Sequence, residues 1–210
     1  MPEAVSFGLF LTAAVILAVT PGPGIFYVLT RSLKGGRGEG YASAFGTAIG
    51  GLFHVVAAAF GLSAILATSA TAFNVVKLMG AVYLIYLGVR TLLRKDASFE
   101  IEAGQQRQNR RAVLQGILTE MLNPKTALFF LAFIPQFVNP NGAVVAQFIL
   151  LGCISVFLNT AVDVVVATMA GPIGQQLQKR ARLRKGQRLF TGGSLITLGA
   201  YVALSGGDQQ

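Results

Sequence analysis

The chain of 210 residues is 53% hydrophobic and only 12% charged, and its mean hydropathy is +0.63. Because soluble domains carry about 25% charged residues, this composition excludes a water-soluble globular domain and indicates a membrane protein. One cysteine, Cys153, and one histidine provide neither an internal disulfide nor a Cys/His cage for a metal ion. We therefore expect no bound metal and no cofactor.

The first apolar run starts within MPEAVSFGLF, which has no Lys or Arg. A cleaved signal peptide begins with a basic region, so we expect this run to be kept as a membrane span. Spans need roughly 20 apolar residues, and six runs approach that length. They lie near residues 4–30, 41–67, 72–93, 112–138, 143–170 and 188–206. All are too long for strands, which predicts an all-α, polytopic membrane fold of six transmembrane helices in a single domain.

Charge alternates among the segments that join these runs. The first, third and fifth connections are rich in Lys and Arg, whereas the second and fourth, ATSAT and NPNG, carry no charge. Short cytoplasmic loops collect basic residues, so we expect the three basic connections inside the cell and both termini outside. Topology then explains the formal net charge of +9, and we expect no nucleic-acid partner.

The third connection, near residues 94–111, divides the chain into two halves of three helices, about 1–93 and 112–210. An odd number of spans per half makes the halves face opposite sides of the bilayer, which is the inverted repeat of many secondary transporters. Such a repeat predicts matching features in the first and fourth helices. Proline interrupts both, in LAVTPGPGIFYVL and in LTEMLNPKTALFFLAF.

Each interruption also has the sequence of a helix start. Thr20-Pro21 and Asn123-Pro124 each pair an N-cap residue with proline at the first helical position. Both lie roughly 12–18 Å from the expected inner end, near mid-bilayer, so two new helix N-termini are expected to converge there. Free N–H groups at such ends attract anions, and unwound backbone in a bilayer is tolerated where it lines a cavity.

We therefore expect the two interruptions to bind the carboxylate of a substrate. Glycines in the first interruption let a ligand approach the backbone, and Lys125 adds a full positive charge in the second. The residues expected to bind are Thr20, Pro21, Gly22, Pro23, Gly24, Asn123, Pro124 and Lys125. The structural alternative is a pair of proline kinks that neighbouring helices stabilise, with no ligand.

Two acidic residues lie at membrane depth, where ionisable groups are costly and usually face the bundle or a cavity. Glu120 precedes the second interruption, and Asp163 shares a helical stripe with Ser155 and Asn159. Each is a candidate to hold a substrate ammonium or to carry a proton, because buried carboxyl groups can exchange protons near neutral pH. The alternative is that each pairs with a cation such as Lys125.

Secondary candidates are His54, Asn159 and Lys77. His54 follows Ala42, Gly46 and Gly50 on one stripe, and small residues at this spacing let helices pack closely. We expect a hydrogen-bonded packing role for His54. The stripe serves either packing within the chain or a homodimer. Lys77 lies near the outer end of its helix, where its side chain can snorkel to the surface.

Three segments, LAVTPGPGIFYVL, VVKLMGAVYLIYLG and LNPKTALFFLAFIPQFV, are similar to the LysE/RhtB family of bacterial amino-acid exporters. The resemblance implies export of small amino acids from the cytoplasm across the inner membrane, driven by the proton gradient. It also implies that the Pro21-Gly22-Pro23 and Asn123-Pro124-Lys125 segments line or shape the transport site. Glu120 departs from the neutral residue that is commoner before the second motif, which leaves the substrate open.

The leading hypothesis is a secondary transporter for small neutral amino acids, such as threonine, homoserine or leucine, working by proton antiport. Export of cationic amino acids or of another small metabolite is the nearest alternative. An intramembrane enzyme would need a nucleophile or metal set, and one His with one Cys does not supply it, so we do not expect an enzyme. A sensor without transport and a metal exporter are the remaining alternatives.

Overall fold

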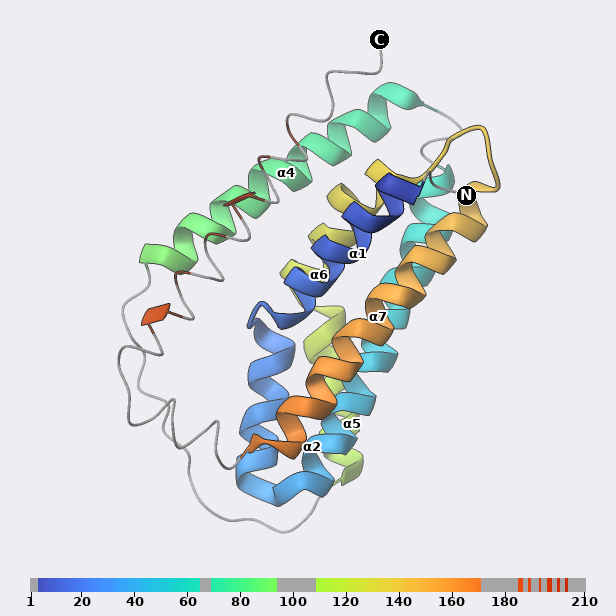
Figure 1. Cartoon of the computed structure of the whole chain (residues 1–210). Coiled ribbons are helices and arrows are strands. Elements are labelled where there is room, and N and C mark those ends of the chain that lie inside the picture. Colours follow the sequence, from blue (N-terminus) through green and yellow to red (C-terminus); the bar gives the residue numbers. More distant parts are fainter. Residues whose placement is uncertain are drawn as a thin grey trace.

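The computed structural model describes residues 4–64, 69–93 and 109–170, with isolated residues between 185 and 203. Every regular element in these ranges is helical (Figure 1). In chain order they are α1 (Ala4–Val19), α2 (Pro23–Ala57), the π-helix η1 (Ala58–Leu62), α4 (Ala70–Leu93), α5 (Asn109–Met121), α6 (Pro124–Leu128), the π-helix η2 (Phe129–Phe133), the 3-10 helix η3 (Ile134–Phe137) and α7 (Val144–Thr168).

Most of the predicted helices are present. The runs near 72–93 and 143–170 are the single helices α4 and α7. The runs near 4–30 and 112–138 are each interrupted at the prolines, as the sequence predicts. Within the described ranges, Pro23–Leu62 and Val144–Thr168 are long and apolar enough to cross a membrane. Asn109–Met121 and Pro124–Phe137, bent by 42°, form a third such stretch if they are one span. Most of 94–111 and of 188–206 lies outside the described residues.

The first basic connection, predicted as a loop over about 31–40, is instead a turn at one residue, and that prediction was wrong. Gly36 has φ 78° and ψ −175°, and helix continues on both sides of it. A Cβ atom at Gly40 would collide with the hydroxyl of Ser32. Residues eight apart lie about 12 Å apart in a straight helix, so α2 folds back on itself as two arms, residues 23–35 and 37–57. Glycine tolerates the positive φ that this turn requires.

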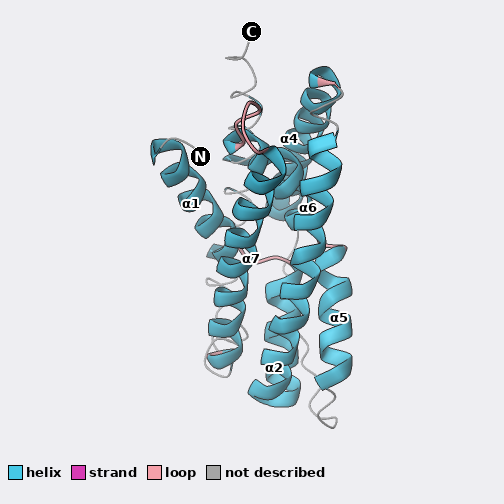
Figure 2. Ribbon diagram, turned by 90° about the vertical axis from the view of Figure 1, so that its right-hand side faces the viewer, coloured by secondary structure: helices cyan, strands magenta, loops and turns pink. Residues whose placement is uncertain are grey.

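The second arm of α2 packs closely against α5 and α7 (Figure 2). A Cβ atom at Gly46 would collide with the carbonyl oxygen of Val113, and one at Gly50 would lie 2.7 Å from that of Ile117. Gly116 of α5 faces the second arm of α2. A Cβ atom at Gly116 would lie 2.8 Å from the carbonyl oxygen of Ser43. The predicted small-residue stripe therefore packs helices within the chain.

An aromatic core fills the half of the molecule around α1, η2 and η3. Phe10, Phe129, Phe133 and Phe148 are all at most 2% exposed, and the Phe129 and Phe133 rings stack with centroids 5.0 Å apart. Large apolar side chains also remain exposed on the outside of the bundle, among them Leu122 at 79% and Phe157 at 71%. So much exposed apolar surface fits a protein that is surrounded by lipid.

Charge separates the two ends of the bundle. The turn at Gly36, the start of α5 and the end of α7 lie together at the lower end in Figure 1, and Arg37 donates to the carbonyl oxygen of Thr168 at 3.1 Å. A cation there complements the negative end of the α7 dipole. The 138–143 connection, at the opposite end, has the uncharged sequence VNPNGA.

Candidate functional site

The two interrupted helices meet in the middle of the bundle. α1 descends to its end at Val19 and α5 ascends to its end at Met121, and α2 and α6 then leave the same region in opposite directions (Figures 1 and 2). The 13 residues of α5 place its break about 20 Å above its start, and the first arm of α2 has a similar length. The breaks therefore lie at matching heights above the basic end.

The second break is built as the sequence predicts. Asn123 is the N-cap of α6, with extended backbone and a side-chain oxygen that accepts from the N–H of Lys125 at 3.1 Å. Pro124 follows in the first turn, where its missing N–H costs nothing.

The first break differs from its prediction. Thr20 is fully buried but is not an N-cap, because its hydroxyl donates back to the Ile16 carbonyl oxygen at 2.6 Å. The N-cap of α2 is Gly22, with no side-chain cap, and Pro23 is the first helical residue. The sequence TPGPG contains two prolines, and either could be the first residue of the helix. In the structure the helix begins at the second proline, Pro23.

Lys125 joins the second break to the first. Its ammonium donates to the carbonyl oxygens of Leu17 at 3.1 Å and of Thr20 at 2.8 Å. These carbonyls lie at the C-terminal end of α1, where the Leu17 oxygen also accepts from the Thr20 N–H at 3.1 Å, and a cation there complements the helix dipole. An ammonium has three donors, so one remains after these two bonds.

Glu120 secures the second break and does not bond Lys125, so the alternative pairing of Glu120 with Lys125 is not present. Its Oε1 accepts from the Thr126 hydroxyl at 2.6 Å and its Oε2 from the Asn123 amide at 3.0 Å. The expected packing role of His54 is confirmed, because its Nε2 donates to the Glu120 carbonyl oxygen at 2.9 Å. These bonds tie α5, α6 and the second arm of α2 together.

Asp163 is the second buried acid, 5% exposed on α7. Its Oδ2 accepts from the hydroxyl of Thr47 at 2.7 Å. On the same face of α7, the Asn159 amide donates to the Ser155 carbonyl oxygen at 3.0 Å. Asp163 thus has one short hydrogen bond, whereas both oxygens of Glu120 are engaged.

A small cavity lies where these groups converge. Its volume open to the centre of a water molecule is about 20 Å³, which is room for roughly one water. It is therefore too tight for a metabolite in this conformation. The lining residues come from α2, the end of α5, α6, η2 and α7: Gly24, Ile25, Thr47, Ala48, Gly51, Glu120, Asn123, Lys125, Thr126, Phe130, Val156, Asn159, Thr160 and Asp163.

Six of the predicted site residues line this cavity: Gly24, Glu120, Asn123, Lys125, Asn159 and Asp163. Thr20, Pro21, Gly22, Pro23 and Pro124 shape the breaks without lining it. The side chain of Lys77 lies outside the described part of the structure. Sequence reasoning missed Thr47 and Thr126, the hydroxyl partners of the two acids. Thr126 had a readable signal, because it is a polar residue directly after the Asn-Pro-Lys motif.

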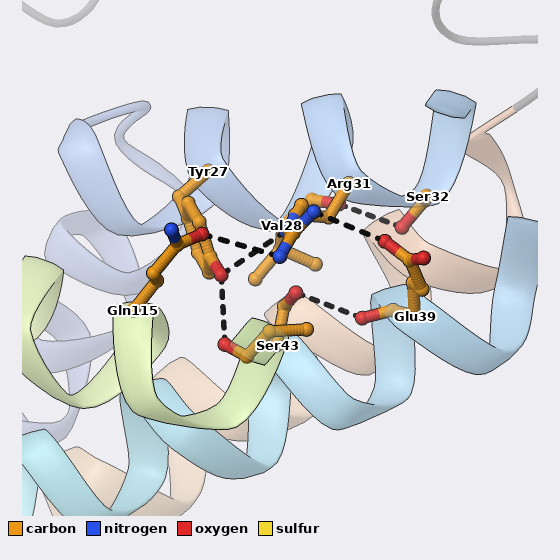
Figure 3. Close-up of polar contacts among 8 residues, drawn as sticks. Tyr27, Val28, Arg31, Ser32, Glu39, Ser43 and Gln115 are labelled. Carbon is orange, nitrogen blue, oxygen red and sulfur yellow. Dashed lines mark hydrogen bonds and ion pairs between the residues drawn. The ribbon is translucent and has the colours of Figure 1, made fainter. Parts of the chain in front are cut away.

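A polar network joins α2 and α5 between the cavity residues and the turn at Gly36 (Figure 3). Arg31 forms an ion pair with Glu39 at 3.3 Å, and Glu39 is only 2% exposed. Arg31 also donates to Gln115 at 3.1 Å and to the Tyr27 hydroxyl at 3.3 Å. The Tyr27 hydroxyl donates to the Ala112 carbonyl oxygen at 2.7 Å. This network joins both arms of α2 to α5.

Comparison with known proteins agrees with this architecture. The chain is 30% identical to a homoserine/homoserine lactone efflux protein of Salmonella typhimurium, over 92% of this chain and 94% of that protein. It is 33% identical to a leucine efflux protein of Klebsiella pneumoniae, over 67% and 68% of the two chains. It is also 30% identical to the uncharacterized membrane protein YrhP of Bacillus subtilis, over 93% and 97%. No solved structure matches.

The profile of one family, described as the LysE type translocator, matches residues 15–206. This match covers both helix breaks, every cavity residue and most of the apolar helices around them. It places the protein among multi-pass membrane transporters and not among enzymes. The chain belongs to the LysE type translocator family.

Proposed function

We propose that this protein exports small neutral or hydroxylated amino acids from the cytoplasm across the bacterial inner membrane, in exchange for protons. The observation that carries the proposal is the cavity between the two helix breaks, where an ammonium, two carboxylates and two helix N-termini converge. A free amino acid carries one negative and one positive group, and this arrangement offers a partner to each. The efflux proteins named among the relatives support an amino-acid cargo.

The cargo carboxylate would bind at the first turns of α2 and α6. Gly24 and Ile25 line the cavity in the first turn of α2, where backbone N–H groups have no helical acceptor. The remaining donor of Lys125 adds charge on the other side. A helix N-terminus with a neighbouring cation is a favourable anion site.

The cargo ammonium would bind Asp163, and the same carboxylate would take the returning proton when the cargo leaves. Asp163 has one hydrogen bond, from Thr47, so it retains capacity for another donor. Glu120 would instead hold the breaks together, because Asn123 and Thr126 already occupy its oxygens. Since the cavity holds roughly one water, the described conformation has no room for the cargo, and transport would require α7 and the second arm of α2 to separate.

The topology proposed from the sequence fits this scheme. Six spans in two inverted repeats, about 1–93 and 112–210 with a linker between them, would relate α1 and α2 to α5 and α6. The basic lower end would face the cytoplasm, with both termini outside.

Cationic amino acids are the second candidate, because the cavity holds two carboxylates and one lysine. A second cargo charge would need its own partner at this depth. Glu120 is the group that could serve, since each of its oxygens retains a lone pair beside the bond from Asn123 or Thr126.

Uptake of radiolabelled amino acids into inside-out membrane vesicles with an imposed pH gradient tests the proposal. Wild-type vesicles should accumulate one or more neutral amino acids, and Lys125→Met vesicles should not. Lys34→Met, the same change at an exposed position, is the matched control and should behave as wild type. No accumulation of any amino acid would exclude the function, and normal accumulation by Lys125→Met would remove Lys125 from the mechanism.

A further inference from the structure

The cavity changes character along its length. The second arm of α2 and α7 run in opposite directions across it, so their residues meet in pairs. Thr47 meets Asp163, and one turn further along α2 a Cβ atom at Gly51 would lie 3.0 Å from a methyl group of Val156. Residues 163 and 156 are about 10 Å apart along α7. Along the contact between α2 and α7, the cavity wall therefore changes from polar at Thr47 and Asp163 to apolar at Gly51 and Val156.

Phe130 completes the apolar end. It lines the cavity from η2 and is 3% exposed. Its ring edge would lie 2.9 Å from a Cβ atom at Gly152, one turn from Val156 on α7. On its other side, the ring centroid of Phe130 lies 5.8 Å from that of His54 in the second arm of α2. The wall that Gly51, Phe130 and Val156 form is close-packed, so a change of one methyl group there changes the available space.

Between the two ends, the polar groups act as acceptors. The Thr160 hydroxyl donates to the Val156 carbonyl oxygen at 2.8 Å, and the Asn159 amide nitrogen donates to the Ser155 carbonyl oxygen. The Thr160 hydroxyl donor and one of the two Asn159 N–H donors are therefore used within α7, while the Thr160 hydroxyl oxygen and the Asn159 Oδ1 retain lone pairs. A group that enters this part of the cavity is favoured if it brings a hydrogen-bond donor.

We infer that Gly51, Phe130 and Val156, with Asn159 and Thr160, form the subsite for the cargo side chain and set which amino acids are exported. This inference rests on the proposed function. Both charged groups of an amino acid sit on one carbon, so they occupy the charged end together and the side chain extends toward the apolar wall. The wall limits side-chain size, and the two acceptors favour a hydroxyl.

The test measures initial rates for alanine, serine, homoserine, valine and leucine in the same vesicle preparations. Val156→Ala enlarges the subsite and should raise the rate for leucine relative to alanine by about tenfold, the discrimination that one or two methyl groups give in an apolar pocket. Gly51→Ala adds a methyl group against Val156 and should lower the same ratio. Val156→Thr keeps the shape, adds a hydroxyl and should shift preference toward homoserine.

Two substitutions of the same type serve as controls. Val165→Ala changes an exposed residue of α7, and Gly61→Ala adds a methyl group where no atom lies within 4 Å. Both should leave the rate ratios unchanged. A ratio within one preparation does not depend on the amount of folded protein. Equal changes for all cargoes, or the same shift in the controls, would overturn the subsite, whereas a wild type that moves no amino acid would overturn the function itself.

Discussion

Gly24→Ala probes the contact between the two helix breaks. A Cβ atom at Gly24 would lie 2.6 Å from Oε2 of Glu120, closer than a real Cβ atom approaches an oxygen. The Glu120 carboxylate must therefore move, and we expect it to lose its bond from the Asn123 amide, which is 3.0 Å long. A hydrogen bond to a charged group contributes about 1.5–3 kcal/mol, whereas alanine is favoured over glycine in a helix by about 1 kcal/mol.

The expected net loss of stability is thus about 0.5–2 kcal/mol, or about 1–8 °C in Tm for a chain of this size. Thermal unfolding in mild detergent, followed by circular dichroism, measures it. Gly22→Ala should cost less, because its Cβ would lie 3.2–3.4 Å from the flexible Lys125 side chain. Gly8→Ala meets no atom within 4 Å and should be neutral or slightly stabilising.

A double-mutant cycle separates the clash from other effects of the methyl group. In a Glu120→Ala background the colliding atom is absent, so Gly24→Ala should become neutral or stabilising by up to about 1 kcal/mol. An equal cost in both backgrounds would show that the breaks do not touch as described. So would a Gly24→Ala protein as stable as wild type.

Three further substitutions test other parts of the structure. Gly50→Ala would press against backbone of α5 at 2.7 Å and should destabilise by about 1–3 kcal/mol in thermal unfolding, with Gly61→Ala as a neutral control; tolerance of Gly50→Ala would refute the close helix contact. Asp163→Asn keeps an acceptor for the Thr47 hydroxyl and should leave Tm within a few degrees, but it should raise the half-saturating cargo concentration about 10–100-fold; unchanged transport kinetics would remove Asp163 from the site. Glu39→Gln breaks a buried ion pair with Arg31 and should cost about 2–3 kcal/mol in the same unfolding assay; an unchanged Tm would show that the network contributes no stability.

The sequence predicted the features that depend on local chemistry. An asparagine directly before a proline is a strong N-cap candidate, and Asn123 is the N-cap of α6 in the structure. The spacing of Gly46, Gly50 and His54 predicted a helix face that packs closely, and this was confirmed because the residues on such a face share one neighbour. The prediction of Thr20 as an N-cap was wrong because TPGPG contains two prolines. Local sequence rules do not decide which of them begins the helix.

Features that depend on how the helices pack were not predictable in this way. The ammonium of Lys125 bonds carbonyls more than a hundred residues away, so its nearest acid in sequence was a poor guide to its partner. The turn at Gly36 replaced a longer loop because Ser32 and Gly40 pack directly on each other, a contact that exists only in the folded chain. Val156 and Phe130 were missed because nothing distinguishes them from the many apolar residues that face lipid or core.

The most direct test of the account is an experimental density map of the protein in nanodiscs with a bound amino acid that it transports. The account predicts density for the cargo between the first turns of α2 and α6, with its carboxylate near Gly24 and Lys125 and its ammonium near Asp163. Cargo bound elsewhere in the bundle, or two helix breaks held apart with no cargo between them, would contradict it.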